Sequence, residues 1–550
     1  RPPVQLLRSN HLLLPQQPQF PQQPSSPRPH WLGHGVSEEE HTEMLLRGDG
    51  AGGSDAASAS SSESSVPPDG VFRTYPGASA AAGAFRTYPL NRRTLPPGIP
   101  YIIVNEGAER FSYYGMKAIL VIFFTHDLGM SDALAREYYH AFTAACYFFP
   151  LCGALLAETV LGKYRTIMYF SYVYCGGHLA LSLSQAPHAP SAGASAAAAA
   201  AAAAPSSPQM PFLFGLGLLL IAVGAGGIKP CVSAVLGDQF CAANQPLLAP
   251  TFAAFYLAIN AGAFLSTLAT PALLEHAGPH VAFGVPGLLM AASTLAMWLG
   301  RTSYAHIPPA GAGFVREACG ATGRAALAKL LPLFAFFSAF WSLYDQTGSA
   351  WVLQAEKMNR SFLGVQWLPS QVACVNPLLI LLLVPAFNGF VLPQGGRRVP
   401  GLYDLAGSVV RVTPLRKISA GLFLLAASFL LPLHVETRIA AGEAPSIGLQ
   451  LLAYLVLTSA EVLVSVTGLE FAYTQAPTKM KSAVMALFLA STALGNLFTA
   501  LVNLLITNAD GSTATSDVAY FCFFVALMFV VAVAFVPFAY TFREQTFVQG

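Results

Sequence analysis

The chain has 550 residues, of which 54% are hydrophobic and 10% are charged, and its formal net charge is +2 at pH 7. Soluble domains average about 25% charged residues, so this composition excludes an ordinary soluble protein and indicates a polytopic membrane protein. The small net charge gives no support for nucleic-acid binding, and the eight cysteines show neither metal-ligand spacing nor a disulfide framework.

The first segment in chain order is residues 1–95, which are rich in Pro, Gln, Ser, Gly and Ala. Such a composition cannot bury a core, so we expect a disordered low-complexity tail. Twelve apolar stretches follow, and each predicts a membrane-spanning helix. They lie at 100–125, 136–157, 165–185, 211–230, 251–274, 281–300, 329–350, 368–393, 416–434, 447–468, 481–506 and 518–541.

The longest inside loop, a cytoplasmic linker at 301–328, divides these stretches evenly. We therefore expect an all-α polytopic membrane protein with 12 transmembrane helices in two six-helix bundles. The N-terminal bundle is 99–300, with an alanine-rich outside loop at 186–210, the C-terminal bundle is 329–541, and 542–550 is a short cytoplasmic tail. The run Ala196–Ala204 is the rival candidate for a thirteenth span, but flanking prolines bound it tightly.

The distribution of lysine and arginine tests both the count and the orientation. With the N-terminal tail in the cytoplasm, the inside loops hold twelve of these residues and the outside loops hold four. The outside four are Arg136, Lys357, Arg360 and Arg438. This excess predicts that both termini lie in the cytoplasm.

The most informative motif lies in the first apolar stretch, where 106–117 reads EGAERFSYYGMK. A charge near the bilayer centre costs about 2.5–3.5 kcal/mol on insertion scales, so Glu106, Glu109 and Arg110 need partners or a water-lined cavity. Glu106 and Arg110 are four residues apart on one helical stripe, so they can pair, and protonation of a glutamate would release the pair. This chemistry suits a proton-coupled carrier, and the alternative is a structural ion pair between helices.

Several motifs resemble those of the proton-coupled oligopeptide transporter family of the major facilitator superfamily. They are ExxERFxYY at 106–114, GAGGIKPCVS at 224–233, FYLAINAG at 255–262, FWSLYDQTGS at 340–349 and EVLVSVTGLEFAYTQAP at 461–477. In this order they cover most of 99–541 and look most like animal-type di- and tripeptide carriers. The resemblance implies a major facilitator fold that holds its substrate near the midplane, between two bundles that rock around it.

The resemblance also implies which residues couple transport to protons. They are Glu106, Glu109, Arg110, His140 and Lys229. His140 matches a histidine tied to coupling in animal-type members, and its titration near neutral pH suits that work, although a lone helix histidine is usually structural. Lys229 precedes Pro230, where a helix can break, and the resemblance links it to the glutamates. The alternative is a lysine that snorkels at the end of its helix.

A peptide is a zwitterion, so its binding site needs opposite charges for its two ends. The expected substrate-binding residues are Arg110, Tyr114, Lys117, Tyr147, Lys229, Asn260, Trp341, Asn376 and Glu461. The resemblance implies that Arg110 and Lys229 meet the carboxylate and that Glu461 meets the ammonium. The alternative for Glu461 is a structural pair with a lysine. The two asparagines suit a peptide backbone or, equally, interhelical hydrogen bonds, and the aromatic residues are alternatively core packing.

One position departs from the family pattern. Lys329 and Asn388 fall where animal-type relatives resemble a charged pair, but here the acid is replaced by an amide. This gate therefore cannot be a salt bridge.

We expect a proton-coupled symporter that imports di- and tripeptides by alternating access, with protons as the coupling ion and no cofactor. A carrier of the same fold for nitrate, histidine or an organic acid is the nearest alternative, and a non-transporting peptide sensor is another. No nucleophile–base pair or metal cluster occurs in the spans, so an enzyme is not expected. The expected partners are the peptide, protons and the lipid bilayer. We expect a monomer in the plasma membrane rather than in a vacuolar or lysosomal membrane.

Overall fold

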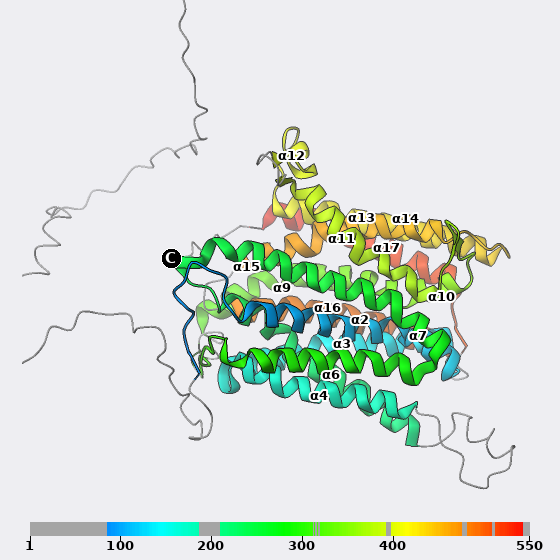
Figure 1. Cartoon of the computed structure of the whole chain (residues 1–550). Helices are drawn as coiled ribbons and strands as arrows, with labels where there is room; N and C mark the ends of the chain where they lie inside the picture. The colour runs from blue at the N-terminus through cyan, green and yellow to red at the C-terminus, as the bar shows by residue number, and fades with distance from the viewer. Residues whose placement is uncertain are drawn as a thin grey trace, which may run out of the picture. The chain divides into compact units, whose positions relative to one another are not determined.

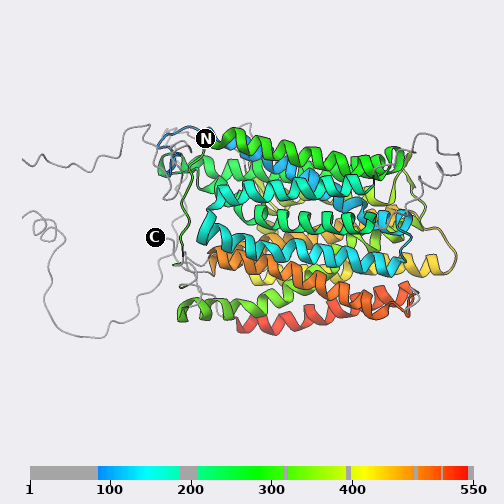
Figure 2. The ribbon, with the colours of Figure 1, turned by 90° about the horizontal axis from the view of Figure 1, so that it is seen from below.

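A computed structural model of the chain describes residues 85–185, 209–311, 313, 316, 320–391, 398–475, 481–508 and 512–542. The expectations for residues 1–84, for the alanine-rich loop up to residue 208, for part of the 301–328 linker and for the tail from residue 543 lie outside these ranges. Long helices dominate the described part, and they lie side by side with their connections at two ends (Figures 1 and 2).

Five helices form the N-terminal half. They are α2 (Ile99–Ile122), α3 (Asp132–Leu156), α4 (Lys163–Ser184), α6 (Gln209–Gly237) and α7 (Leu248–Leu299). Local signals set several boundaries: Pro100 stands in the first turn of α2, and the Ser131 side chain caps α3 by accepting from the Leu134 amide. Helix α7 contains two of the predicted spans, 251–274 and 281–300. Gly278, with a φ of 81°, interrupts the helix between them.

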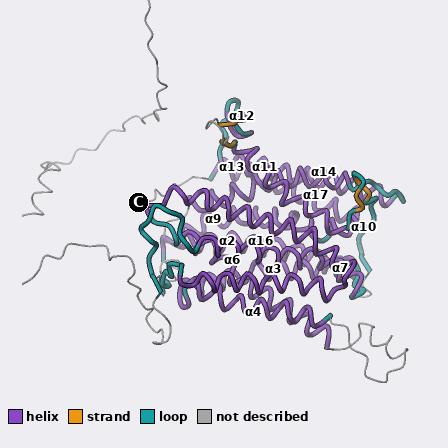
Figure 3. Tube along the Cα trace, viewed as in Figure 1, coloured by secondary structure: helices purple, strands orange, loops and turns teal. Residues whose placement is uncertain are grey.

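The C-terminal half contains the remaining helices. They are α9 (Ala321–Tyr344), α10 (Ala350–Glu356), α11 (Val375–Asn388), α12 (Leu402–Gly407), α13 (Pro414–Ala440), α14 (Gly448–Glu461), α15 (Thr467–Thr474), α16 (Lys481–Ile506) and α17 (Asp517–Thr541). Two short antiparallel hairpins stand in the connections, β1 (Ser361–Phe362) with β2 (Val365–Gln366) and β3 (Phe390–Val391) with β4 (Arg398–Val399) (Figure 3).

Every one of the predicted apolar stretches lies largely in one described helix or in two consecutive ones. By length and composition alone, nine helices in the described part are able to cross a membrane. The kinked α7 counts once among them. Helix α2 does not qualify because Glu106, Glu109 and Arg110 crowd it with charge, and α4 is too polar.

Two hydrophobic cores divide the described residues into two bundles. The first core joins α2, α3, α4, α6 and α7, and also takes in Val352 and Leu353 from α10. The second core runs from Leu330 in α9 to Phe535 in α17. The bundles meet mainly where α16 packs along α3 and where α11 lies against α7. Residues from both bundles therefore face each other across one seam.

The sequence-based boundary of the tail at residue 95 is too late. Residues 85–95 are described and contact the first bundle, where the Phe85 ring stacks on His306 with centroids 4.4 Å apart. The Arg86 side chain is 9% exposed and donates to the Ser303 carbonyl, and the His306 amide donates to the Arg86 carbonyl. These two side chains bury surface that a composition argument over the whole tail does not detect.

Candidate functional site

A cavity of about 220 Å³ lies on the seam between the bundles. Helices α2, α3 and α7 line it from one side, and α9, α11, α14 and the turn Asp345–Gly348 line it from the other. Of the expected substrate-binding residues, seven are part of its wall: Tyr114, Lys117, Tyr147, Asn260, Trp341, Asn376 and Glu461. Arg110 and Lys229 do not line it. The wall is rich in tyrosine, and it also contains Tyr139, Tyr256, Tyr344 and Tyr454.

The charged motif of α2 forms a compact buried cluster. The Arg110 Nε atom lies 2.9 Å from Glu106 and 2.7 Å from Glu109, and all three side chains are buried. One guanidinium thus compensates two carboxylates inside the first bundle. The predicted pairing of Glu106 with Arg110 is confirmed, and Glu109 joins it. Protonation of either glutamate would remove one of the two charges that hold Arg110 in place.

Lys117 has a partner that the sequence analysis did not assign to it. Its Nζ atom lies 2.9 Å from Asp345 Oδ1, and both side chains are about nine-tenths buried. Lys117 belongs to α2, whereas Asp345 begins the turn after α9, so the pair connects the two bundles at the wall of the cavity. In this conformation Asp345 already occupies the Lys117 ammonium, which a substrate carboxylate must therefore share or displace.

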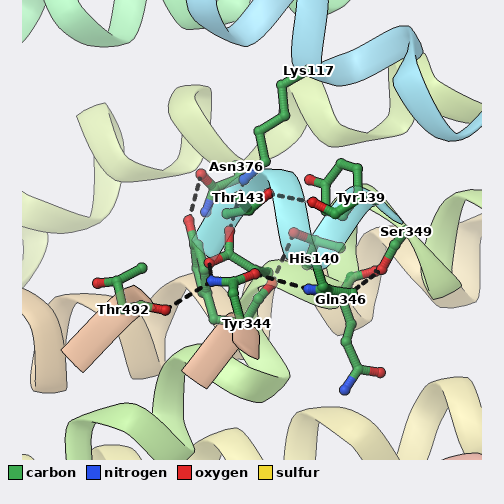
Figure 4. Close-up of polar contacts among 12 residues, drawn as sticks. Lys117, Tyr139, His140, Thr143, Tyr344, Gln346, Ser349, Asn376 and Thr492 are labelled. Atoms are coloured by element: carbon green, nitrogen blue, oxygen red, sulfur yellow. Dashed lines mark hydrogen bonds and ion pairs between the residues drawn. The ribbon is translucent and has the colours of Figure 1, made fainter. Parts of the chain in front are cut away.

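His140 lies at one end of a hydrogen-bonded chain that leads to the same aspartate. Its Nδ1 atom lies 2.8 Å from Asn496 Oδ1. Its Nε2 atom lies 2.8 Å from the Ser349 hydroxyl (Figure 4). The Asn496 amide nitrogen donates to Asp345 Oδ2, at 2.7 Å, and to the Thr492 carbonyl.

These contacts fix the tautomer of His140. Both partners of the Asn496 nitrogen are acceptors, so the amide orientation is determined and its oxygen must accept from His140 Nδ1. In the neutral ring, Nε2 then accepts from the Ser349 hydroxyl. Nε2 is therefore the atom that takes an incoming proton, and Ser349 can turn its hydroxyl to the Gln346 carbonyl, 3.5 Å away.

Glu461 has amide and hydroxyl neighbours rather than a cation. Its Oε2 atom accepts from Asn376 Nδ2 at 2.8 Å, and the same nitrogen lies 3.0 Å from the Thr458 hydroxyl. Tyr344 donates to the Asn376 oxygen at 3.2 Å. Within the described residues Glu461 forms no ion pair, so the alternative of a structural pair with a lysine does not hold in this conformation.

Lys229 differs from its expected arrangement in two ways. Helix α6 continues through Pro230 to Gly237, so the helix does not break there. The ammonium lies over the rings of Tyr113 and Tyr147, 3.9 and 4.0 Å from their centroids. Among the residues that the structure covers, Nζ is buried and has no hydrogen-bond partner, so Lys229 neither snorkels to water nor bonds the glutamates directly. It nevertheless lies close enough to Glu106 and Glu109 to interact with their charges. Tyr147 separates this cation from the cavity.

The structure also gives the contacts of Asn260, Lys329 and Asn388. Asn260 lines the cavity but donates to the Tyr256 carbonyl of its own helix. Lys329 lies over the Phe542 ring, 5.1 Å from its centroid. Asn388 donates to the Val384 carbonyl one turn earlier, and no contact between it and Lys329 is present among the described residues.

A second set of inter-bundle contacts closes the end of the seam where α2 connects to α3. Lys357 lies 3.0 Å from Asp517 and 3.5 Å from Asp132, and His126 lies 2.8 Å from Glu356. Burial opposes the charge on Lys357, but Asp517 and Asp132 outweigh it and raise the pKa of Lys357 above its ordinary value. Arg136, expected in an outside loop, is instead a buried residue of α3 and pairs with Asp517.

The fold and the cavity together define a membrane transporter of the major facilitator type, with two helical bundles around a central site. The profile of the POT family, PTR2, matches residues 164–325 and 320–518, which is more than half of the chain. The chain therefore belongs to the POT family. This is a family of transporters and not of enzymes.

Comparisons with individual proteins support the assignment to the POT family. The chain is 37% identical to peptide transporter family 1 of Drosophila melanogaster, over 62% of this chain and 48% of that protein. It is 36% identical to solute carrier family 15 member 2 of Danio rerio, over 65% of this chain and 52% of that protein. The chain thus spans about half the length of the curated relatives it matches. A crystal structure of an auto-inhibited POT family peptide transporter superposes with a TM-score of 0.69 at 32% identity, covering 83% of this chain and 99% of that one.

Proposed function

We propose that the protein is a proton-coupled symporter that imports di- and tripeptides by alternating access. The observation that carries the proposal is the partly buried carboxylate of Glu461, which faces the cavity and has no cationic partner among the described residues, while Lys117 stands in the same wall. A peptide supplies the missing cation with its ammonium and a carboxylate for the cationic side. The similarity to the Drosophila melanogaster peptide transporter family 1 and to the auto-inhibited POT family peptide transporter supports this proposal.

The contacts suggest how the first bundle releases a cation for the substrate carboxylate. A proton on Glu106 or Glu109 leaves Arg110 with one carboxylate instead of two, so the guanidinium gains a free donor. Lys229 lies one ring away from the cavity and has no carboxylate partner among the described residues. Neither side chain lines the cavity in this conformation, where Lys117 is the cation of the wall. We assign Arg110 and Lys229 to the substrate carboxylate, as the resemblance implies, in a state in which protonation has released Arg110.

The chain from His140 suggests how a second protonation opens the seam. Protonated His140 carries its charge one amide away from Asp345, where it competes with Lys117 for that carboxylate. The ion pair between the bundles then weakens, and the bundles can separate at that level. The driving force is the proton gradient, which supplies about 2.3 kcal/mol per charge for each 100 mV, with the pH difference in addition.

We place both termini in the cytoplasm, following the lysine and arginine distribution, so the cluster around Lys357 lies on the outer side. The described conformation is then closed to the outside by that cluster. We further propose that the protein works as a monomer in the plasma membrane and needs no cofactor besides protons.

The nearest alternative, a carrier of nitrate, histidine or an organic acid, is separated by a competition experiment. The protein is reconstituted in liposomes, and uptake of a labelled dipeptide is measured with an excess of each unlabelled solute. The proposal predicts that di- and tripeptides compete and that nitrate, histidine and simple organic acids do not. Uptake of nitrate or histidine in place of the dipeptide would contradict the proposal. Saturable dipeptide binding without any uptake would instead support the sensor.

A further inference from the structure

An exposed apolar platform lies in the connection between α11 and α13. We call residues 402–410 the α12 platform. Four of its side chains are largely exposed, with exposed fractions of 48% for Leu402, 57% for Leu405, 84% for Val409 and 53% for Val410. All residues from 404 to 410 are exposed. Leu402 and Leu405 are three residues apart on one face of α12. Val409 and Val410 follow in the turn that ends the helix, where both amides donate to the Ala406 carbonyl, so the exposed apolar side chains are gathered in one short segment.

The platform is held in place by its surroundings. Asp404 accepts from the Gly401 amide at 2.9 Å and forms an ion pair with Arg398 at 3.0 Å, which ties α12 to strand β4. Tyr403 packs its ring against Phe387, with centroids 5.3 Å apart, and the Lys417 ammonium lies 3.6 Å from the centre of the same ring. The Tyr403 ring thus packs onto the protein, while about half or more of the surface of Leu402, Leu405, Val409 and Val410 stays exposed among the described residues.

The position of the α12 platform favours the lipid surface as the medium that covers it. It connects α11 and α13, two helices long and apolar enough to cross the bilayer, and it projects sideways from the bundle rather than beyond the helix ends (Figure 1). A segment in that place lies at the boundary between lipid and water. Burying an amphipathic segment in this boundary is favourable when its apolar face enters the acyl region.

The charge of the neighbouring residues selects the kind of lipid. Between 398 and 417 the sequence contains Arg398, Arg411, Arg416 and Lys417, and Asp404 is the only acid. Arg398 is neutralised by Asp404, whereas Arg411 and Arg416 are exposed. Arg411 directly follows Val410, and Arg416 lies in the first turn of α13. Basic groups beside an inserted apolar face are attracted to anionic headgroups.

We propose that the α12 platform inserts Leu402, Leu405, Val409 and Val410 into the bilayer surface and that Arg411 and Arg416 bind the phosphates of anionic phospholipids. On the orientation proposed above, this surface is the cytoplasmic leaflet. The contact anchors the connection between α11 and α13, both of which belong to the C-terminal bundle.

A fluorescence experiment on the full chain tests the insertion. Val409→Cys is made in a variant whose native cysteines are replaced, labelled with an environment-sensitive dye, and placed as one copy per lipid nanodisc. Ala310→Cys is the matched control, because Ala310 is an exposed residue of the 303–311 connection at the same end of the bundle. We expect lipids brominated in the acyl chains to quench the dye at 409 and iodide in the water to leave it bright, with the reverse pattern at 310.

A dye at 409 that iodide quenches as strongly as at 310 would overturn the insertion. Protection from both quenchers would also overturn it, because with one copy per disc the cover would then be another part of the same chain. Exposure to iodide in single-copy discs with protection in discs that hold two copies would assign the platform to a dimer contact instead. None of these readouts depends on transport, so failure of the proposed function leaves the test intact.

A second measurement tests the lipid charge. Quenching by brominated phosphatidylglycerol is compared with quenching by brominated phosphatidylcholine at position 409. We expect the anionic lipid to quench more, and we expect Arg411→Gln combined with Arg416→Gln to remove that difference while the apolar insertion remains. The control is Arg438→Gln, in the last turn of α13 and therefore at the opposite end of that helix. Equal quenching by both lipids in the unsubstituted protein would overturn the headgroup assignment.

Discussion

Lys117 and Asp345 form a buried ion pair of 2.9 Å that joins the first helix of the N-terminal bundle to the turn after α9 in the C-terminal bundle. The same aspartate accepts from Asn496, which contacts His140. A single amide, that of Asn496, thus connects the carboxylate that holds the bundles together to an imidazole that can take up a proton. The account of coupling depends on this arrangement.

Replacing only one partner of the Lys117–Asp345 ion pair should destabilise the protein more than replacing both partners together. Loss of one partner leaves an uncompensated buried charge, which costs about 3–5 kcal/mol. We expect Lys117→Gln and Asp345→Asn each to lower the unfolding temperature and the double variant to recover much of the loss, as read in a double-mutant cycle. The exposed pair Arg438–Glu443 is the control and should give about 0–1 kcal/mol. Additive losses at positions 117 and 345 would contradict the pairing.

Asn496 should act as a positioning residue for the proton site. Asn496→Leu removes the acceptor that fixes Nδ1–H of His140, so we expect the dependence of peptide uptake on external pH to shift. Asn503→Leu is the control, because Asn503 lies two turns further along α16 and donates to the Thr499 carbonyl and to the Tyr520 hydroxyl. A pH profile that stays unchanged in Asn496→Leu, at normal expression, would limit Asn496 to a structural role.

Glu461 should recognise the free amino terminus of the peptide. An acetylated dipeptide lacks the ammonium, so it should compete poorly against the unsubstituted protein. In Glu461→Gln the free dipeptide should bind worse by about 1.5–3 kcal/mol, and the gap between free and acetylated ligands should shrink. Inhibition constants for both ligands on both proteins provide the measurement. An undiminished preference for the free amine would assign the ammonium to another group, with Asp345 as the first candidate.

Two adjacent glycines of α4 offer a test of helix packing. A Cβ atom at Gly177 would lie 2.8 Å from the Gly217 carbonyl and 2.8 Å from Ile221, whereas a Cβ atom at Gly176 would meet nothing within 4 Å. We expect Gly177→Ala to destabilise the protein by about 1–3 kcal/mol through overpacking against α6. Gly176→Ala should be neutral or stabilise by about 0.5–1 kcal/mol, because alanine favours the helix. Thermal unfolding in detergent compares the two, and equal effects would contradict the close approach of α4 and α6.

Sequence periodicity was enough to predict the helices, because each apolar stretch is a local property of the chain. It also predicted the pair of Glu106 with Arg110, which are one helical turn apart. Partners distant in sequence could not be predicted in this way: Asp345 is 228 residues from Lys117, and Asn496 is 356 residues from His140. Only the packing of the two bundles brings these side chains together.

The expected break of the helix after Lys229 was wrong, because it also depended on packing that the local sequence does not reveal. A proline after a glycine-rich stretch can break a helix, but α6 packs closely along α3 and α4 and continues through Pro230. A Cβ atom at Gly226 would collide with Phe149, and one at Gly227 would collide with Phe170. The glycines therefore serve close packing of three helices rather than a break. Single-sequence patterns do not separate these two uses of glycine.

The most direct test of the central claim is concentrative uptake in liposomes under an imposed pH gradient. The full chain is reconstituted, the outside is made acidic, and accumulation of a labelled dipeptide is followed with and without a protonophore. The account predicts accumulation above the external concentration that the protonophore abolishes, and exchange without accumulation in Glu109→Gln. Equal accumulation with and without the gradient, or full accumulation in Glu109→Gln, would contradict it.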